Sequence, residues 1–198
     1  MTARRALILG GTGMVDEVAR MLIGEGWRVV LPSRRPNPIA RAGGRPALRA
    51  SRPRGHRPNG KPGGSGDAIW VEAQWERPRE LARRAEHALG GPAELLVAWV
   101  HESYRRSVLG AVERLLTAEA PIVEVRDGIG IGTSDQADPL LVEHPTQQVF
   151  LGSRSGWDGA RVLTHAEITE GVLDAVRRAL EGRPTSVHQI GQPRPLVR

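Results

Sequence analysis

The chain has 198 residues, the length of one ordinary domain or of one domain with a long insertion. Its hydrophobic fraction of 39% is enough to bury a core, and no apolar run approaches the roughly 20 residues that span a bilayer. Cysteine is absent, which excludes disulfides, thiolate nucleophiles and cysteine-based zinc sites. The first residues contain no apolar signal-peptide core, and we therefore expect a cytoplasmic protein without a membrane segment.

The positive charge is concentrated in one segment. Between Arg34 and Gly66 lie nine cationic side chains and no acid, whereas the formal net charge of the whole chain is +6. The rest of the chain is therefore net negative. Because no aromatic side chain for base stacking lies among these cations, a solvated basic loop is a simpler interpretation than a nucleic-acid-binding surface.

The first third of the chain follows the order strand, glycine turn, helix, strand. The apolar run from Arg5 to Leu9 leads into glycines, and apolar residues then recur at helical spacing from Met14 to Leu22. Trp27 to Leu31 is apolar and β-branched and predicts the next strand, which ends at Pro32 and Ser33. This order and length are typical of a βαβ unit.

The segment from Pro36 to Gly66 differs in composition. It is rich in proline, glycine and arginine and cannot bury enough apolar surface to offset its ordering entropy, so we predict a mobile loop insertion. Any crossover helix within it would be no longer than Ile39 to Arg45.

Strands and helices alternate again after this segment. The predicted strands are Ala68 to Ala73, Glu94 to Val100, Ile122 to Val125 and Gln148 to Leu151, and the predicted helices are Pro78 to Leu89, Ser103 to Ala118 and Thr164 to Leu180. Thr164 and Glu167 form a capping box at the start of the last helix. Alternation of this kind predicts an α/β protein with a Rossmann-like, doubly wound parallel sheet, as a single domain over residues 1–181, with 36–66 as its insertion and 182–198 as a flexible tail.

A phosphate-binding turn is predicted directly after the first strand, at Gly10, Gly11, Thr12, Gly13 and Met14. Glycines let the backbone approach a pyrophosphate, whose charge is met by unpaired amides and by the dipole of the following helix. Counted as G-x-G-x-x-G from Gly11, the third glycine position holds Asp16, which departs from the motif. The alternative is that Asp16 is a first-turn acid facing water, which a helix N-terminus favours.

Three stretches resemble a known group of proteins. They are Ala6 to Met14, Leu96 to His101 and Val162 to Ile168. Together they resemble small bacterial short-chain dehydrogenase-like, NAD(P)-binding Rossmann proteins, over residues 5–35, 68–118 and about 147–181. The resemblance implies a nicotinamide-binding Rossmann core, but it does not by itself imply dehydrogenation.

The catalytic pair of short-chain dehydrogenases is missing from this sequence. Their mechanism requires a tyrosine activated by a lysine four residues later, with a serine on the preceding strand end. The only tyrosine is Tyr104, with Val108 four residues on, and the only lysine is Lys61 in the basic segment. Arginine does not replace the lysine, because its acidity and geometry differ. Any hydride transfer would need another group to handle the proton.

The end of the second strand bears on the choice of cofactor. NAD-selective Rossmann proteins place an acid about 20 residues beyond the glycines, and no acid lies between Arg28 and Gly66. Ser33, Arg34 and Arg35 fit an adenosine 2′-phosphate instead, so the sequence favours NADP over NAD. The alternative is that these arginines merely begin the basic segment.

His101 is the candidate general acid or base. It follows the fourth strand, at the carboxyl edge where open α/β sheets bind ligands, and histidine exchanges protons near neutral pH. The alternative is a solvent-facing or capping histidine. The glycine-rich stretch from Asp127 to Asp135 is either a lid that brings Ser134 or Asp127 into the site or a surface turn. The histidines lack metal-ligand spacing, and we expect no metal site.

These observations predict an NADP(H)-binding oxidoreductase that acts on a small organic substrate through a nonstandard active site. Two alternatives stay open: a noncatalytic nucleotide-binding or redox-sensing protein, and another reaction class, such as an isomerase or a cyclase, on the same fold. We expect a small-molecule partner and neither nucleic acid nor membrane, and a homo-oligomer is left open.

Overall fold

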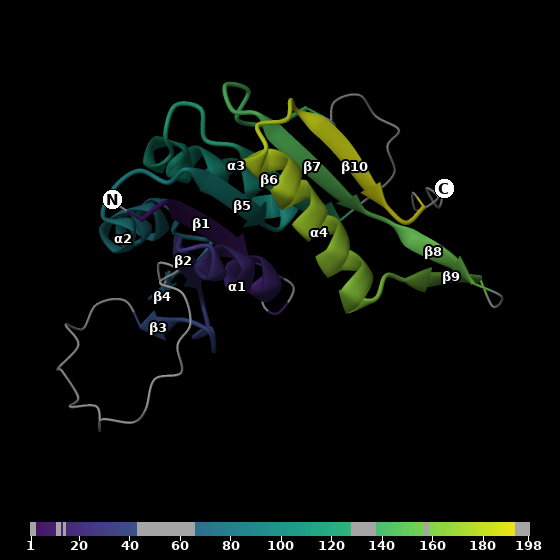
Figure 1. Cartoon of the computed structure of the whole chain (residues 1–198), viewed down its shortest axis with the longest axis horizontal. Helices are drawn as coiled ribbons and strands as arrows, with labels where there is room; N and C mark the ends of the chain where they lie inside the picture. The colour runs from purple at the N-terminus through teal and green to yellow at the C-terminus, as the bar shows by residue number, and fades with distance from the viewer. Residues whose placement is uncertain are drawn as a thin grey trace, which may run out of the picture.

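A parallel sheet with helices on both faces forms the body of the molecule (Figure 1). The computed structural model describes residues 3–10, 13, 15–42, 66–127, 138–156 and 159–192. The strands of the main sheet are β1 (Arg5–Gly10), β2 (Arg28–Ser33), β3 (Arg41–Ala42), β4 (Asp67–Glu72), β5 (Leu95–Trp99), β6 (Ile122–Asp127), β7 (Thr146–Leu151) and β10 (Ser186–Ile190). The helices are α1 (Asp16–Gly24), α2 (Pro78–Leu89), α3 (Glu102–Val112), the short 3-10 helix η1 (Glu113–Leu115) and α4 (His165–Leu180). A separate antiparallel hairpin consists of β8 (Ser153–Gly156) and β9 (Gly159–Val162).

The order of the strands defines the fold. It is β10-β7-β6-β5-β1-β2-β4-β3, and every neighbouring pair is parallel. From β1 the chain passes to β2, to β3 at the edge and back to β4 between them. It then crosses to β5, on the other side of β1, and continues outward to β10. This is the single-domain, doubly wound α/β sheet of the Rossmann type that the alternation of elements predicted.

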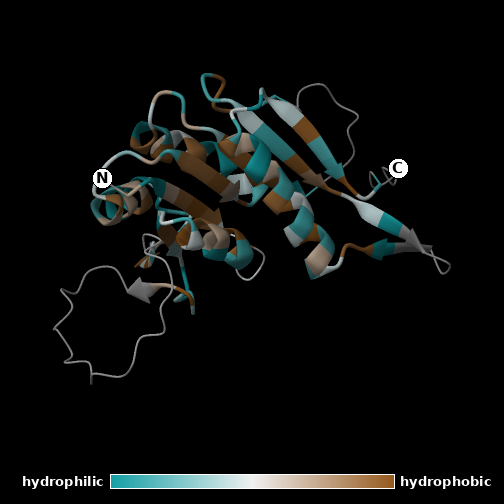
Figure 2. Ribbon diagram, viewed as in Figure 1, coloured by the Kyte–Doolittle hydropathy of each residue, from teal (hydrophilic) through white to brown (hydrophobic). Residues whose placement is uncertain are grey.

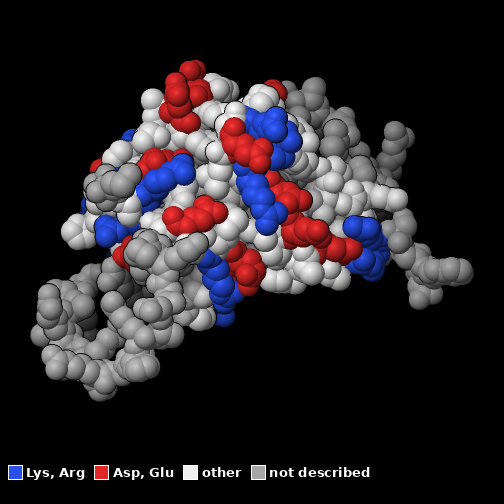
Figure 3. Space-filling model, viewed as in Figure 1, with Lys and Arg blue, Asp and Glu red and all other residues white. Residues whose placement is uncertain are grey.

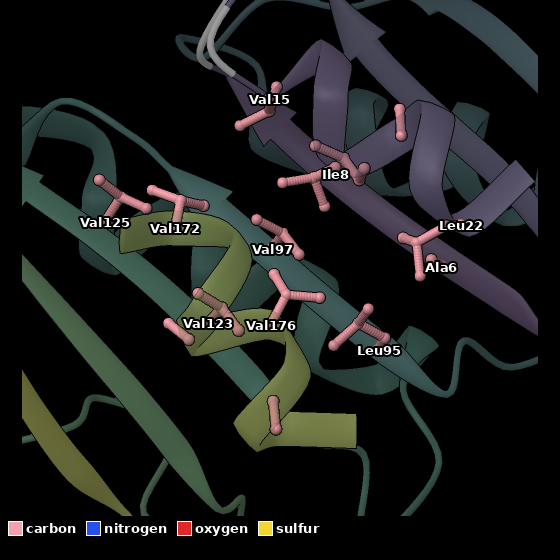
Figure 4. Close-up of a cluster of buried hydrophobic side chains, with 14 of the residues drawn as sticks. Ala6, Ile8, Val15, Leu22, Leu95, Val97, Val123, Val125, Val172 and Val176 are labelled. Atoms are coloured by element: carbon pink, nitrogen blue, oxygen red, sulfur yellow. The ribbon is translucent and has the colours of Figure 1, made fainter. Parts of the chain in front are cut away.

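Two apolar layers hold the helices on the sheet. Residues of β1 alternate between them: Ala6 and Ile8 face α1 and α4, whereas Leu7 and Leu9 face α2 and α3. Because both faces of β1 and β5 are buried, these two strands are almost entirely apolar (Figure 2). Figure 4 shows the first layer, in which Val172 and Val176 of α4 lie over the valines of β5 and β6.

The insertion is only partly a loop. Arg41–Ala42 forms β3, which pairs with β4 at the edge of the sheet, and the residues before it form a turn in which the Ala40 amide donates to the Asn37 carbonyl. The sequence limited any crossover helix to Ile39 to Arg45, and the described part of that range, up to residue 42, forms a turn and a strand. Ile39 and Ala40 pack against the core, which explains why this part is ordered despite its composition. The remaining residues of the predicted insertion, 43–65, lie outside the described residues.

The expectation of a flexible tail over 182–198 is wrong for its first half. Ser186–Ile190 forms β10, which pairs in parallel with β7. Its inward polar side chains are satisfied by Gln147, whose Oε1 lies 2.6 Å from the Ser186 hydroxyl and 2.8 Å from His188 Nε2. Ile190 packs over Gly171 of α4, where any Cβ would overlap it. An edge strand held by polar pairs gives no apolar periodicity, so the sequence did not reveal it.

Candidate functional site

The carboxyl ends of the parallel strands share one edge of the sheet, and the strand order reverses next to β1. β1 lies between β2, which begins the half of the sheet on one side of β1, and β5, which begins the half on the other side. Open α/β sheets bind ligands in the crevice at such a reversal. The strand ends at this edge include Gly10, Ser33, Glu72, Trp99, Asp127 and Leu151.

The glycine turn begins where β1 meets β5. Gly10 has a φ of +80°, and a Cβ on it would overlap the carbonyl oxygen of Trp99. Gly13 has a φ of +92°. Both positions therefore require glycine, for conformation and, at Gly10, also for space. Gly11, Thr12 and Met14, which belong to the same predicted turn, lie outside the described residues.

Asp16 is the first residue of α1. Its Oδ1 accepts a hydrogen bond of 2.8 Å from Asn37 Nδ2, in the loop that follows β2. The carboxylate thus joins the start of α1 to that loop, at a helix end that favours negative charge. This contact gives Asp16 a structural role at the position where the motif would have glycine.

The candidate 2′-phosphate residues lie at the end of β2. The Ser33 hydroxyl donates to the Arg35 carbonyl at 2.6 Å and accepts from Trp70 Nε1 at 3.0 Å. These bonds fix the turn that carries Arg34 and Arg35, both exposed. Within the described part of the chain, neither arginine forms an ion pair. Their guanidinium groups are therefore available at the same edge as the glycine turn.

His101 lies two residues beyond β5 and caps α3. Its Nδ1 accepts a hydrogen bond of 3.3 Å from the backbone amide of Ser103, so the neutral ring carries its proton on Nε2. The ring is exposed, and its centroid lies 6.5 Å from that of Tyr104. The Tyr104 hydroxyl donates to Glu76 at 3.2 Å. The capping role that the sequence left open is thus present, and it leaves Nε2 accessible for proton transfer.

A buried charge network beside His101 was not foreseen from the sequence. Arg105 of α3 binds Glu124 of β6 through two hydrogen bonds, and the two side chains are only 8% and 4% exposed. Arg126, also of β6, binds Glu102 at 3.2 Å and lies over the Phe150 ring at 5.3 Å. Alternation along β6 places Glu124 and Arg126 on one face. The sequence signal that could have indicated this network is the mixed charge of Glu124 and Arg126 at the end of a predicted strand, together with Arg105 in a predicted helix.

Removing one partner of this pair is expected to destabilise the fold strongly. Glu124→Gln leaves the Arg105 guanidinium buried without its counter-charge, which costs about 3–5 kcal/mol of unfolding free energy. Urea unfolding followed by circular dichroism measures the loss. Glu86→Gln is the matched control, because Glu86 also makes a two-bond contact with an arginine, Arg114, but at the surface. That variant should lose no more than about 1 kcal/mol. Equal losses in the two variants would contradict the prediction.

The N-terminus of α4 lies beside the glycine turn. Thr164 and Glu167 form the predicted capping box, and the Nε2 atom of His165 lies 3.8 Å from the place of a Cβ on Gly13. Glu167 also binds Arg161 of β9 and Arg154 of β8, which fastens the hairpin to α4. The hydrogen bonds from Arg161, followed by the backbone bond from Thr164, hold the pKa of Glu167 far below its usual range. The hairpin and His165 were not singled out from the sequence as parts of this edge.

The described surface carries mixed charge on the face shown in Figure 3. Acidic and basic side chains are interspersed there. Among the described residues several exposed charges are paired, such as Arg177 with Asp174 and Arg161 with Glu167. Across the described residues, every helix is too short or too polar to span a bilayer. Over the same residues, no three His, Asp or Glu side chains gather in a way that could hold a metal ion. The predicted lid residue Ser134 lies outside this part of the chain, and Asp127 is the exposed last residue of β6.

Comparison with known proteins places the fold. No family model matches the sequence, and no curated protein matches it. Among solved structures, the chain is similar to a double variant of a short-chain dehydrogenase/reductase from Serratia marcescens, with a TM-score of 0.56 and 11% identity over 95% of this chain and 96% of that one. It is also similar to a putative short-chain alcohol dehydrogenase from Burkholderia multivorans, with a TM-score of 0.52 and 14% identity over 96% and 97% of the two chains. A third similar structure is the NADH-dependent reductase A1-R′, with a TM-score of 0.50 and 14% identity over 96% of both chains. At identities this low, the structural similarity shows a shared fold and nothing further.

Proposed function

We propose that the protein binds NADP(H) and transfers hydride to or from a small organic substrate, as an oxidoreductase without the tyrosine-lysine pair. The observation that carries this proposal is the glycine turn at the strand reversal, where Gly10 and Gly13 both have positive φ and a Cβ at Gly10 would overlap Trp99. Glycine at these two positions lets the backbone come close to a diphosphate, because neither Gly10 nor Gly13 carries a side chain. Two of the solved structures of similar fold are a short-chain dehydrogenase/reductase and a putative short-chain alcohol dehydrogenase by name, which agrees with this chemistry.

Each part of the cofactor has candidate partners in the chain. Gly10 and Gly13 would approach the diphosphate, and Ser33, Arg34 and Arg35 would hold the adenosine 2′-phosphate. The nicotinamide ring supplies or accepts the hydride. His101 Nε2, at the end of β5, would donate or accept the accompanying proton, since Nδ1 is engaged by Ser103.

The departure from the short-chain dehydrogenase mechanism rests on Tyr104. Its hydroxyl bonds Glu76, and the residue four positions on, Val108, is a buried core residue of α3. No ammonium group is therefore present there to activate the tyrosine. The same observation favours the second candidate, a noncatalytic nucleotide-binding or redox-sensing protein.

Replacing Arg34 and Arg35 together by alanine tests the choice of cofactor. The double variant should lose about 1.5–3 kcal/mol of NADPH binding free energy, because charge-assisted hydrogen bonds to the 2′-phosphate are lost, and little of its NADH affinity. Calorimetric titration with both cofactors measures this. Arg79 and Arg83 of α2 provide a control double variant that removes the same charge elsewhere. A parallel loss for both cofactors would show that Arg34 and Arg35 act only through general charge, and a wild-type preference for NADH would contradict NADP selectivity.

A further inference from the structure

Trp75 lies in a short loop that is fixed at the carboxyl edge of the sheet. The loop follows β4, and the Ala73 amide at its start donates to the Ser33 carbonyl at 3.1 Å. Its other side is bound to α3 by the 3.2 Å hydrogen bond between Tyr104 and Glu76. The loop therefore spans the distance between the end of β2 and the first turn of α3.

The indole of Trp75 reaches back to the start of the glycine turn. Its Cζ2 atom lies 3.6 Å from the place that a Cβ on Gly10 would occupy. The side chain packs against the apolar layer under α2 and α3 and is only half-buried. An aromatic surface is thus held next to Gly10 and partly open to solvent.

The Trp75 ring lies where the adenosine part of a dinucleotide would be expected. With the diphosphate on the glycine turn and the 2′-phosphate at Ser33, the adenosine must lie between β1 and the ends of β2 and β4. The Trp75 loop is bonded to Ser33, and the Trp75 ring lies next to Gly10, so the loop adjoins both points. Aromatic side chains stack on bases with a gain of about 1–3 kcal/mol per base.

We propose that Trp75 is the adenine-binding residue of this chain and that the base stacks on the open part of its indole. This inference rests on the proposed function, since it takes the glycine turn as the diphosphate site. A tryptophan that only fills the core would contribute to folding but not to the affinity for an adenine ring.

Two substitutions separate stacking from packing. Trp75→Phe keeps an aromatic ring, whereas Trp75→Leu keeps an apolar side chain without one. The Leu variant should bind ADP about ten- to hundredfold more weakly than the wild type, and the Phe variant should stay within about fivefold. Thermal unfolding of both variants, followed by circular dichroism, shows that each one is folded.

The titrations use ADP, nicotinamide mononucleotide, NADPH and NADH, each measured by calorimetry. A loss of ADP affinity in the Leu variant, with unchanged affinity for nicotinamide mononucleotide, supports the role of Trp75. ADP binding should also quench tryptophan emission in the wild type and quench it less in Trp75→Phe. Equal ADP affinity of the wild type and the Leu variant would overturn the inference, and so would a wild type that binds no ADP. A wild type that binds ADP through Trp75 but neither dinucleotide would remove the proposed function and retain the inference.

Discussion

Gly13→Val is expected to abolish dinucleotide binding. The branched side chain would project from the turn at the point where the diphosphate has to approach the backbone amides. Because Gly13 has a φ of +92°, a conformation that costs an L-residue about 1–2 kcal/mol, the variant should also be moderately less stable. Calorimetric titration with NADPH measures the binding, and thermal unfolding measures the stability.

Gly24→Ala is the matched control for that experiment. Gly24 ends α1, the helix that the turn opens, and a Cβ there has no atom within 4 Å. Alanine should therefore be tolerated, and NADPH affinity should match that of the wild type. If the Gly13 variant binds NADPH as tightly as this control, the turn does not form the diphosphate site.

The alternating core was predictable because its signal is local. The helix α2 begins and ends where the sequence predicts, since Pro78 can occupy the first turn and Gly90 takes the left-handed conformation that ends a helix. The capping box at Thr164 is likewise a short-range pattern that the structure confirms. The strand β1 was recognised from its apolar run alone, and Gly10 and Gly13 have the positive φ that the turn requires.

The parts that the sequence did not reveal depend on contacts between distant residues. β10 is an edge strand, and its Ser186 and His188 side chains bond Gln147, about 40 residues earlier in the chain. The Arg105–Glu124 pair joins a helix to a strand, and the sequence alone does not distinguish this buried arginine and glutamate from exposed ones. Trp75 lies outside any periodic segment, so only the folded sheet order brings it to Gly10. Residues of the site supplied by loops between strands therefore require the structure.

Catalysis depends on His101 if the protein is an oxidoreductase, and His101→Asn should then lower turnover by about 10²–10⁴-fold. Asparagine can still accept a hydrogen bond from the Ser103 amide as the cap of α3, so the fold should be retained while the imidazole, the proposed proton-transfer group, is lost. NADPH affinity should change little, because the His101 ring is proposed to transfer the proton and not to bind the cofactor. The measurement is NADPH oxidation with a panel of small aldehydes and ketones, using the substrate that the wild type turns over fastest.

Tyr104→Phe is the comparison that decides between the two candidate groups. The tyrosine hydroxyl already donates to Glu76 and has Val108 where an activating lysine would be, so its loss should reduce turnover far less than the loss of His101. A collapse of activity in the Tyr104 variant, with full activity in the His101 variant, would reverse the assignment. If the wild type oxidises NADPH with no carbonyl of the panel yet binds it tightly, the noncatalytic alternative becomes the better account, because binding at the glycine turn requires no proton-transfer group.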